Sequence, residues 1–322
     1  MTEPAKPVVS VVMPAYNASQ YIAESLDSVF AQTLAEFEIL VTNDAAPDTP
    51  ALESVLARYT DPRLIYLKTD VNKSASGARN ACIRAARGEF VAFLDADDKW
   101  KPEYLSRMVA VMRADPGLSV LYSNCIWFGA TPFAGQTYMS LLPSSRPVTL
   151  EALLSERAKP TTSSVMARRE ALLEVGLFDE TLRCVEDFDL WCRLAARGKR
   201  FDFIEDPLMM RRAADGLTSN TVACYNHIIR IFENNRNLPG LTEHHHRIID
   251  ESLERYRAEL DLHLGKCSLE EKKYAAAKEH LKRANAYLKR PKLQVVITLL
   301  DVAPPLARAL NNYRKKAQQQ PA

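Results

Sequence analysis

Three carboxylates follow directly on an apolar run in the segment FLDADD, residues 93–98. Like charges this close repel one another, so each carboxyl group is pushed toward protonation unless a cation neutralises it. A hard divalent ion, Mg²⁺ or Mn²⁺, accepts one or two carboxylates and fills its remaining positions with water and phosphate oxygens. Asp95, Asp97 and Asp98 therefore predict a metal site that holds a diphosphate. The alternative is a polar loop in which Asp98 caps a helix beginning near Lys101.

Acidic side chains stand at two other places where chemistry is expected. Asp44 follows a second apolar run, and it can either contact a ligand or form an Asx turn before Pro47. Glu186 and Asp187 begin a helical pattern, where the helix dipole and unpaired N–H groups favour acidic residues as caps. The same dipole would keep a carboxylate ionised at neutral pH, as a general base has to be. Both interpretations stay open at each place.

Apolar runs rich in β-branched residues alternate with helical patterns in the first part of the chain. The predicted strands are residues 8–13, 37–42, 64–67, 89–94 and 118–122. Ser19 is expected to cap one intervening helix, and Ser76 to cap another that runs to Ala86. The alternation predicts an α/β sheet with helices on both faces. Ligands bind such sheets beyond the carboxyl ends of the strands, which is where residues 14–17, 43–44 and 95–98 stand.

The chain changes character near Asp215 and Gly216. From residue 218 onward, long helical stretches rich in Glu, Arg, Lys and Leu replace the strand pattern. A chain of 322 residues, 47% of them hydrophobic and 25% charged, suits one large domain with an appendage. We therefore expect an α/β domain over residues 1–215 and an all-helical extension over residues 216–322.

Charge and composition limit the function classes. Residues 278–316 hold ten Lys or Arg and two acidic residues, a local charge of +8 that leaves about −6 elsewhere in a chain of net charge +2. No signal peptide or membrane span is expected at the N-terminus, because its apolar run is too short. No GxGxxG or GxxxxGK(S/T) motif occurs, which argues against a dinucleotide dehydrogenase or a P-loop enzyme. The six cysteines form no CxxC pair and are expected to be reduced thiols of a cytoplasmic protein.

Five segments, taken in order, resemble the family-two inverting glycosyltransferases of the GT-A fold. They are VSVVMPAYNASQYIAESLDSVFAQT, FEILVTNDAAPDT, NKSASGARNACIRAARGEFVAFLDADD, PTTSSVMARREALLEVGLFDE and EDFDLWCRLAARG, within about residues 8–212. The resemblance implies a Rossmann-like α/β fold with a mixed, mostly parallel sheet flanked by helices. It also implies transfer of a sugar from a nucleotide-sugar donor, with a UDP-sugar favoured because that donor is frequent in the family.

The resemblance implies a role for each matching residue. The donor would lie against Pro14, Ala15, Tyr16, Asn17, Asp44, Arg79, Asp95 and Ala96. Asp97 would bind the metal, Mn²⁺ or Mg²⁺, and Asp187 would deprotonate an acceptor hydroxyl that attacks the anomeric carbon with inversion. Glu186 and Trp191 would stand on the acceptor side.

The chain departs from the family pattern in two loops. Asn43 stands where relatives usually carry a first Asp, and Ala45-Ala46-Pro47 replaces the favoured Gly-Ser-Thr. Ser74 stands where a glycine is common. These departures bear on the turn geometry and the donor loop, and therefore on the base and the sugar that the chain selects.

The basic C-terminal stretch has two interpretations, and both stay open. The apolar residues 293–300 are too few to cross a bilayer, but together with the basic residues of 289–316 they suit a membrane interface. The alternative is a helix that packs on its own domain or on a second subunit. A nucleic-acid partner is not expected, because aromatic residues are sparse there. The adjacent histidines 244–246 point in different directions on a helix and are not expected to share a metal.

The sequence thus predicts a transferase of surface polysaccharide synthesis, acting on a glycan or lipid-linked acceptor at the inner face of the cytoplasmic membrane. The alternative is a scaffold protein that binds a nucleotide sugar without turnover, and the intact Asp97 and Asp187 argue against it. A nucleotidyltransferase is disfavoured because residues 14–17, PAYN, lack the glycine-rich basic loop that such an enzyme needs.

Overall fold

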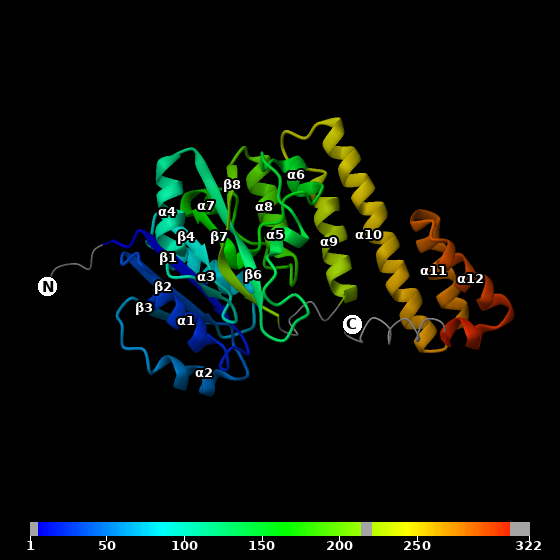
Figure 1. The fold of residues 1–322 in the computed structure, drawn as a ribbon, viewed down its shortest axis with the longest axis horizontal. Coiled ribbons are helices and arrows are strands. Elements are labelled where there is room, and N and C mark those ends of the chain that lie inside the picture. Colours follow the sequence, from blue (N-terminus) through cyan, green and yellow to red (C-terminus); the bar gives the residue numbers. More distant parts are fainter. Residues whose placement is uncertain (1–5, 214–220, 310–322) are drawn as a thin grey trace. The chain divides into compact units, whose positions relative to one another are not determined.

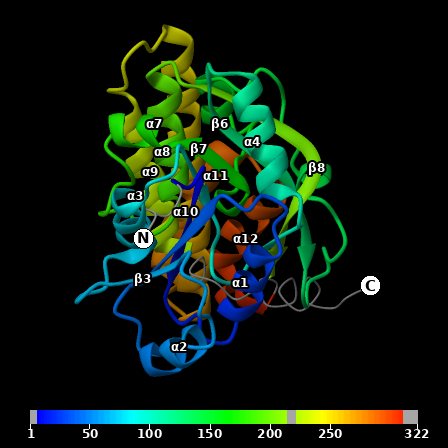
Figure 2. The ribbon, with the colours of Figure 1, turned by 90° about the vertical axis from the view of Figure 1, so that its left-hand side faces the viewer.

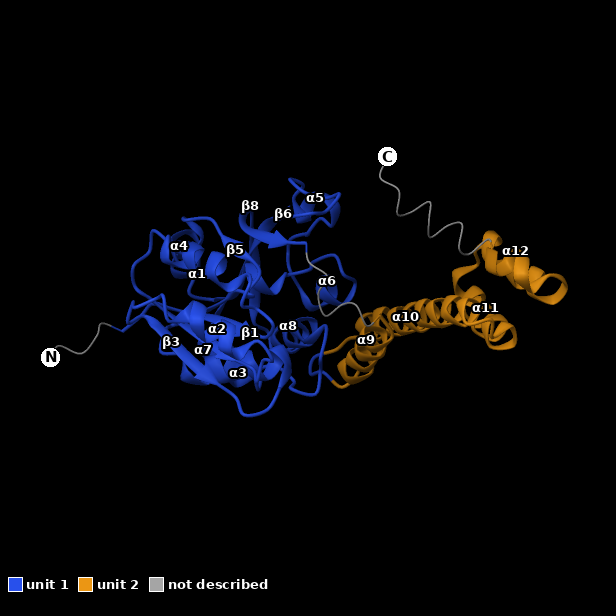
Figure 3. Cartoon of the chain, turned by 90° about the horizontal axis from the view of Figure 1, so that it is seen from below, with its two compact units in different colours: residues 1–215, 238–240 blue, residues 216–237, 241–322 orange. Residues whose placement is uncertain are grey.

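The computed structural model describes residues 6–213 and 221–309 of the chain. The chain divides into two compact units, coloured separately in Figure 3. The first unit comprises residues 1–215 with 238–240, and the second comprises residues 216–237 with 241–322. The domain boundary predicted at Asp215 and Gly216 falls in the segment 214–220, which lies outside the described residues.

Within the described residues, eight strands of the first unit form one sheet (Figure 1). The strands are β1 (Val9–Ala15), β2 (Phe37–Asn43), β3 (Leu64–Lys68), β4 (Phe90–Phe93), β5 (Lys99–Trp100), β6 (Leu118–Phe128), β7 (Val165–Arg168) and β8 (Arg200–Arg212). Their order across the sheet is β3-β2-β1-β4-β7-β6-β8-β5. Strands β3, β2, β1 and β4 are parallel, β6 is parallel to β8, and β7 is antiparallel to β4 and β6. The predicted mixed, mostly parallel sheet is therefore confirmed.

Helices cover both faces of this sheet. They are α1 (Ile22–Phe30), α2 (Thr49–Leu56), α3 (Ser74–Ala85), α4 (Tyr104–Ala114), α5 (Tyr138–Leu141), α6 (Leu150–Leu154), the short 3-10 helix η1 (Thr162–Ser164), α7 (Arg169–Glu174) and α8 (Glu186–Ala196). On one face, α1, α2 and α4 share an apolar core with Val11 and Met13 of β1. On the other face, Phe93 of β4 meets Trp191 of α8 with ring centroids 6.1 Å apart. Because both faces are covered, β1 and β2 are buried along almost their whole length.

All five predicted strands are present, and their ends agree within two residues except that β6 continues to Phe128. The sequence does not predict β5, β7 or β8. Strand β8 carries Glu205, Asp206 and Pro207 in its middle, and these residues break the apolar pattern. It keeps its place through register shifts against β6, and Figure 2 shows it as a long curved strand.

Two predicted helix caps are wrong. Helix α1 begins at Ile22 and has no side-chain cap, while the Ser19 N–H donates to a side chain of another loop. Helix α3 begins at Ser74, so Ser76 lies inside the helix. The buried hydroxyl of Ser76 donates to the Leu182 carbonyl oxygen at 3.1 Å. Both serines are engaged by segments far away in the sequence, which a local capping pattern cannot reveal.

The second unit is helical throughout its described residues. Its helices are α9 (Thr221–Asn235), α10 (Glu243–Glu270), α11 (Tyr274–Leu288) and α12 (Pro291–Val302). Helices α10, α11 and α12 share an apolar core that includes Leu262, Leu281 and Ile297. His245 closes a capping box at the start of α10, where its Nδ1 accepts the Thr242 N–H at 3.0 Å. In the described residues, no helix is both long enough and apolar enough to cross a membrane.

Several turns near the carboxyl ends of the strands use left-handed backbone without glycine. Asn17, Ala45, Ser74 and Val185 have φ of 52°, 48°, 66° and 62°. Ala45 and Ser74 are the positions where the family pattern favours glycine, which adopts positive φ freely. The left-handed conformation is therefore retained at both positions, although each side chain adds a steric cost.

Replacing Ala45 by glycine should raise the free energy of unfolding by about 0.5–1 kcal/mol, because glycine removes the clash of Cβ at positive φ. Ala46→Gly is the matched control, since Ala46 is buried and has no positive φ. Loss of its buried methyl group should lower the stability by about 1 kcal/mol. Urea denaturation of the three proteins measures both differences. A less stable Ala45→Gly variant would show that this turn is not strained.

Candidate active site

The guanidinium of Arg79, on α3, joins two of the acidic segments singled out in the sequence. It donates to the carboxylates of Asp95 and Glu186, each at 2.6 Å. The side chains of Arg79 and Glu186 are 5% and 13% exposed, so water screens this pair little. Burial alone would lower the pKa of Arg79, but the charges of Asp95 and Glu186 outweigh it and raise the pKa. Arg79 therefore stays charged and ties the loop after β4 to the first turn of α8.

The loop after β4 brings the three aspartates into different surroundings. Asp98 is buried, and its carboxylate accepts the backbone N–H of Arg212 at 2.8 Å. Burial, and then the charges of Asp97 and Asp95, raise the pKa of Asp98 to about 8. Burial, and then the charge of Asp95, also raise the pKa of Asp97. The proposed helix cap at Asp98 is wrong, since α4 begins at Tyr104 without a side-chain cap.

Asp187 lies in the first turn of α8. Its carboxylate accepts the Thr162 hydroxyl at 2.7 Å and the backbone N–H of Phe188 at 2.8 Å. Burial, and then the charge of Glu186, raise the pKa of Asp187, while the Thr162 hydrogen bond opposes this rise. Val185 occupies the N-cap position in a left-handed conformation, so the chain turns sharply just before the two carboxylates.

Asp44 is buried and holds the segment between β3 and α3. Its carboxylate accepts the Lys73 N–H at 2.8 Å and the Thr69 hydroxyl at 3.0 Å. Its own N–H donates to the Ala15 carbonyl oxygen at 3.1 Å. The Asx turn expected at this point is formed by the preceding Asn43. Asp44 thus links the ends of β1 and β2 to the start of α3, whose later turns carry Arg79.

The other residues predicted on the donor side differ in how much of the side chain is accessible. Tyr16 is 46% exposed, Asn17 is exposed and Pro14 is half-buried. The side chains of Ala15 and Ala96 are buried. Those two alanines can therefore offer a ligand only their backbone groups.

Trp191 does not stand on the acceptor side, and that prediction is wrong. The indole is 1% exposed and packs against Phe93 and Phe178, with ring centroids 6.1 and 6.4 Å apart. It belongs to the apolar stripe by which α8 is seated on the sheet. The neighbouring Glu186 is held by Arg79 and lies beside Asp187 on the same turn.

Residues 10–176, just over half of the chain, match the model of Glycosyl transferase family 2. The chain belongs to this family. It is 30% identical over 212 residues to the amylovoran biosynthesis glycosyltransferase AmsB of Erwinia amylovora, over 62% of this chain and 67% of that relative. It is 32% identical over 204 residues to the succinoglycan biosynthesis protein ExoO of Rhizobium meliloti, over 60% of this chain and 57% of the relative.

Solved structures share the fold of this family-2 chain. TarS 1–349 of S. aureus, crystallised in complex with UDP-GlcNAc, has a TM-score of 0.65 at 21% identity, covering 96% of this chain and 92% of that chain. The mannosyltransferase PcManGT of Pyrobaculum calidifontis, in complex with GDP-Man and Mn²⁺, has a TM-score of 0.59 at 21% identity, covering 97% and 88%. The α/β GT-A fold with a helical C-terminal region is thereby confirmed.

Two groups of this family-2 site are not predicted by the sequence. Ser163, on η1, accepts the Asp95 N–H at 3.1 Å, next to the Thr162 that holds Asp187. Arg211 lies at the end of β8, and its Cζ is 4.8 Å from the centroid of Trp127. An apolar run, residues 207–210, does precede Arg211, but the acidic residues before that run hide the strand.

Arg211 is a half-buried cation that makes no ion pair within the described part of the chain. The rings of Trp127 and Tyr138 support its guanidinium, the second with its centroid 5.9 Å from Cζ. Burial raises the pKa of Asp97, and the charges of Arg212 and Arg211 act against that rise. Arg211 thus adds positive charge that no ion pair in the described residues neutralises, close to the aspartates of the loop after β4.

The surroundings of Asp97 fit a divalent metal ion that takes only some of its ligands from the protein and others from a bound substrate. The backbone carbonyl of Asp97 accepts the Nε–H of Arg212 at 2.9 Å, whereas its carboxylate accepts no hydrogen bond from another described residue. Among the described residues, no group of three or more His, Cys, Asp or Glu could hold a metal by itself. Mg²⁺ and Mn²⁺ suit such a place, because they bind through one or two carboxylates and take further oxygens from water and phosphate.

Replacing Arg79 by methionine should lower the free energy of unfolding by about 3 kcal/mol, because it leaves the carboxylate of Glu186, whose side chain is only 13% exposed, without its partner. Arg84→Met on the same helix is the matched control. Its ion pair with Glu180 spans 3.5 Å, and its side chain is 60% exposed, so water screens it. Its loss should cost less than about 0.5 kcal/mol. Thermal unfolding compares the two variants, and equal losses would contradict a special role for Arg79.

Proposed function

We propose that this family-2 enzyme transfers a sugar from a nucleoside-diphosphate sugar, a UDP-sugar being favoured, to a hydroxyl of a glycan or lipid-linked acceptor. The observation that carries the proposal is the pair of carboxylates Asp97 and Asp187, which stand on the two segments that Arg79 ties together. Support comes from relatives named for amylovoran and succinoglycan biosynthesis, and from structural neighbours in complex with UDP-GlcNAc and GDP-Man. We place the reaction in surface polysaccharide synthesis on the cytoplasmic side.

Asp97 would hold the divalent metal, Mn²⁺ or Mg²⁺, which supplies charge neutralisation of the nucleoside diphosphate as it leaves. Arg211 contributes fixed positive charge to the same group, and its aromatic supports restrict its motion. Arg79 is already engaged by two carboxylates, so it acts by positioning them. Tyr16, exposed at the end of β1, is available to the nucleotide.

Asp187 takes the proton of the acceptor hydroxyl as that oxygen attacks the anomeric carbon from the face opposite the diphosphate. The bond from the anomeric carbon to the diphosphate oxygen breaks as the new glycosidic bond forms, so the configuration inverts. The Thr162 hydrogen bond holds the carboxylate of Asp187 in place and helps to keep it ionised. Direct displacement requires no covalent intermediate and therefore no activated nucleophile on the enzyme.

Calorimetric titration of the purified chain with UDP, GDP and dTDP, each with and without Mn²⁺, tests the donor site. We expect one nucleotide to bind with a clear dependence on the metal, and Asp97→Ala to weaken that binding by about tenfold or more. Asp206→Ala is the control, because Asp206 is a 62% exposed surface residue paired with Arg107. It should bind like the wild type.

The outcomes separate the enzyme from its alternative. Binding of a nucleotide sugar without any transfer or donor hydrolysis would favour the scaffold protein. Release of pyrophosphate would instead indicate a nucleotidyltransferase. If the folded protein binds none of the nucleotides, with or without Mn²⁺, the proposed donor site is refuted.

The pH dependence of turnover tests the role of Asp187. Because the Thr162 hydrogen bond lowers the pKa of Asp187, Thr162→Val should raise that pKa further. A general base works only when ionised, so the acidic limb of the profile of kcat/KM should move to higher pH in this variant. Thr162→Ser keeps the hydroxyl and should keep the wild-type profile. An unmoved limb in Thr162→Val would assign the limb to another group.

A further inference from the structure

The outer face of α12 carries apolar side chains that the described part of the second unit leaves uncovered. Val295 and Val302 are 56% and 76% exposed, and Leu306, beyond the end of α12, is 52% exposed. On the opposite face, Ile297 and Leu300 are buried in the core shared with α10 and α11. On α12 the outer face recurs at helical spacing at Pro291, Val295, the half-buried Leu299 and Val302. Leu306 follows beyond the end of the helix, and we call these five residues the α12 stripe.

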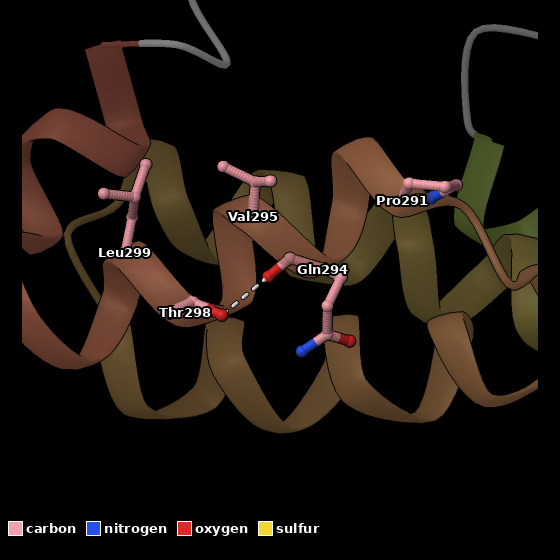
Figure 4. A pocket seen from close by; sticks show the side chains of 5 residues that line it. All are labelled: Pro291, Gln294, Val295, Thr298 and Leu299. Carbon is pink, nitrogen blue, oxygen red and sulfur yellow. Dashed lines mark hydrogen bonds between the residues drawn. The ribbon is translucent and has the colours of Figure 1, made fainter.

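An open hollow lies along the first half of the α12 stripe, as Figure 4 shows. Its lining includes two polar side chains, Gln294 and Thr298. The Thr298 hydroxyl donates to the Gln294 carbonyl oxygen at 3.1 Å, and the Gln294 side-chain oxygen accepts a hydrogen bond from Asn285 at 3.1 Å. Because both side chains find partners in their own unit, the surface presents mainly apolar groups to its surroundings.

The charges around the α12 stripe are mainly positive. Residues 278–309 contain seven Lys or Arg and two acidic residues. Three of the seven cations are ion-paired: Lys278 with Asp301, Arg283 with Asp261 and Arg290 with Glu259. Lys289, at the C-cap of α11, and Lys292, in the first turn of α12, are exposed and make no ion pair within the described residues. An apolar face bordered by unpaired cations suits a partner that combines apolar and anionic surface.

We propose that the α12 stripe docks on an anionic lipid surface. At 12 residues, α12 is far shorter than the roughly 20 needed to span a bilayer, so it would lie along the surface. Val295, Val302 and Leu306 enter the boundary between headgroups and acyl chains. Lys289 and Lys292 meet the headgroup phosphates, the arrangement by which interfacial helices bind.

A second copy of the chain fits this face less well. A stable dimer interface takes roughly 20 or more residues from each side, and the α12 stripe offers five. In a two-fold arrangement the same patch meets itself. Lys292 would then face Arg308 of the other copy if the helices ran antiparallel, or Lys292 of the other copy if they ran parallel, so like charges would oppose each other. Anionic headgroups complement both ends.

Sedimentation of the full chain with vesicles tests the proposal. We expect it to pellet with phosphatidylglycerol vesicles, to stay in solution with phosphatidylcholine vesicles, and to be released in part by high salt. Val295→Asp/Val302→Asp should abolish pelleting, and Lys289→Glu/Lys292→Glu should weaken it by about tenfold or more. Val71→Asp is the matched control, because Val71 is 61% exposed and lies on the first unit. It should pellet like the wild type.

Unchanged thermal unfolding and unchanged nucleotide binding of the double aspartate variant would show that it is folded. Since neither readout involves lipid, failure of this proposal is distinguishable from failure of the proposed transferase. The proposal is overturned if folded wild type does not pellet with anionic vesicles, or if the double aspartate variant pellets as the wild type does. It is also overturned if light scattering shows that the wild type is a dimer and the double aspartate variant a monomer, while neither protein binds vesicles.

Discussion

The buried charge of Arg79 is the constraint around which the first unit arranges its acidic side chains. A guanidinium removed from water has to be compensated, and here Asp95 and Glu186 compensate it at 2.6 Å each. Those two carboxylates belong to segments 91 positions apart in the sequence. Their neighbours Asp97 and Asp187 are therefore fixed relative to each other by a strong electrostatic contact. Asp97 and Asp187, which we propose to act on substrate, are therefore not needed to compensate the charge of Arg79.

The acidic loop after β4 shows how burial assigns different properties to adjacent residues of one type. Asp98 is buried, and burial together with the charges of Asp97 and Asp95 raises the pKa of its carboxyl group to about 8. Asp95 is paired with Arg79, while Asp97 retains a carboxylate that no other described residue bonds. Crowding three carboxylates is tolerable because burial favours the neutral form of one, Arg79 pairs with another and the third is left for a cation.

The elements that could be predicted from the sequence are those whose signals are local. Strands β1, β2, β3 and β4 are short apolar runs, and the acidic residues beyond them stand out against those runs. Strand β8 could not be predicted, because Glu205, Asp206 and Pro207 interrupt its apolar pattern. Because β8 was not predicted, the position of Arg211 at the end of a strand could not be predicted either. Ser76 was misjudged for a related reason, since its bonding partner Leu182 lies 106 positions further along the chain.

The sequence by itself determined the alternation of strands and helices, the acidic rim at the strand ends and the family, because periodicity and residue order are properties of short segments. Only the tertiary structure decided which side chains are free. It buried Trp191 in the core, engaged Asp44 with the Lys73 N–H and paired Glu186 with Arg79. Hydrogen bonds and burial depend on partners brought together by the sheet. No local pattern encodes whether a carboxylate is already occupied.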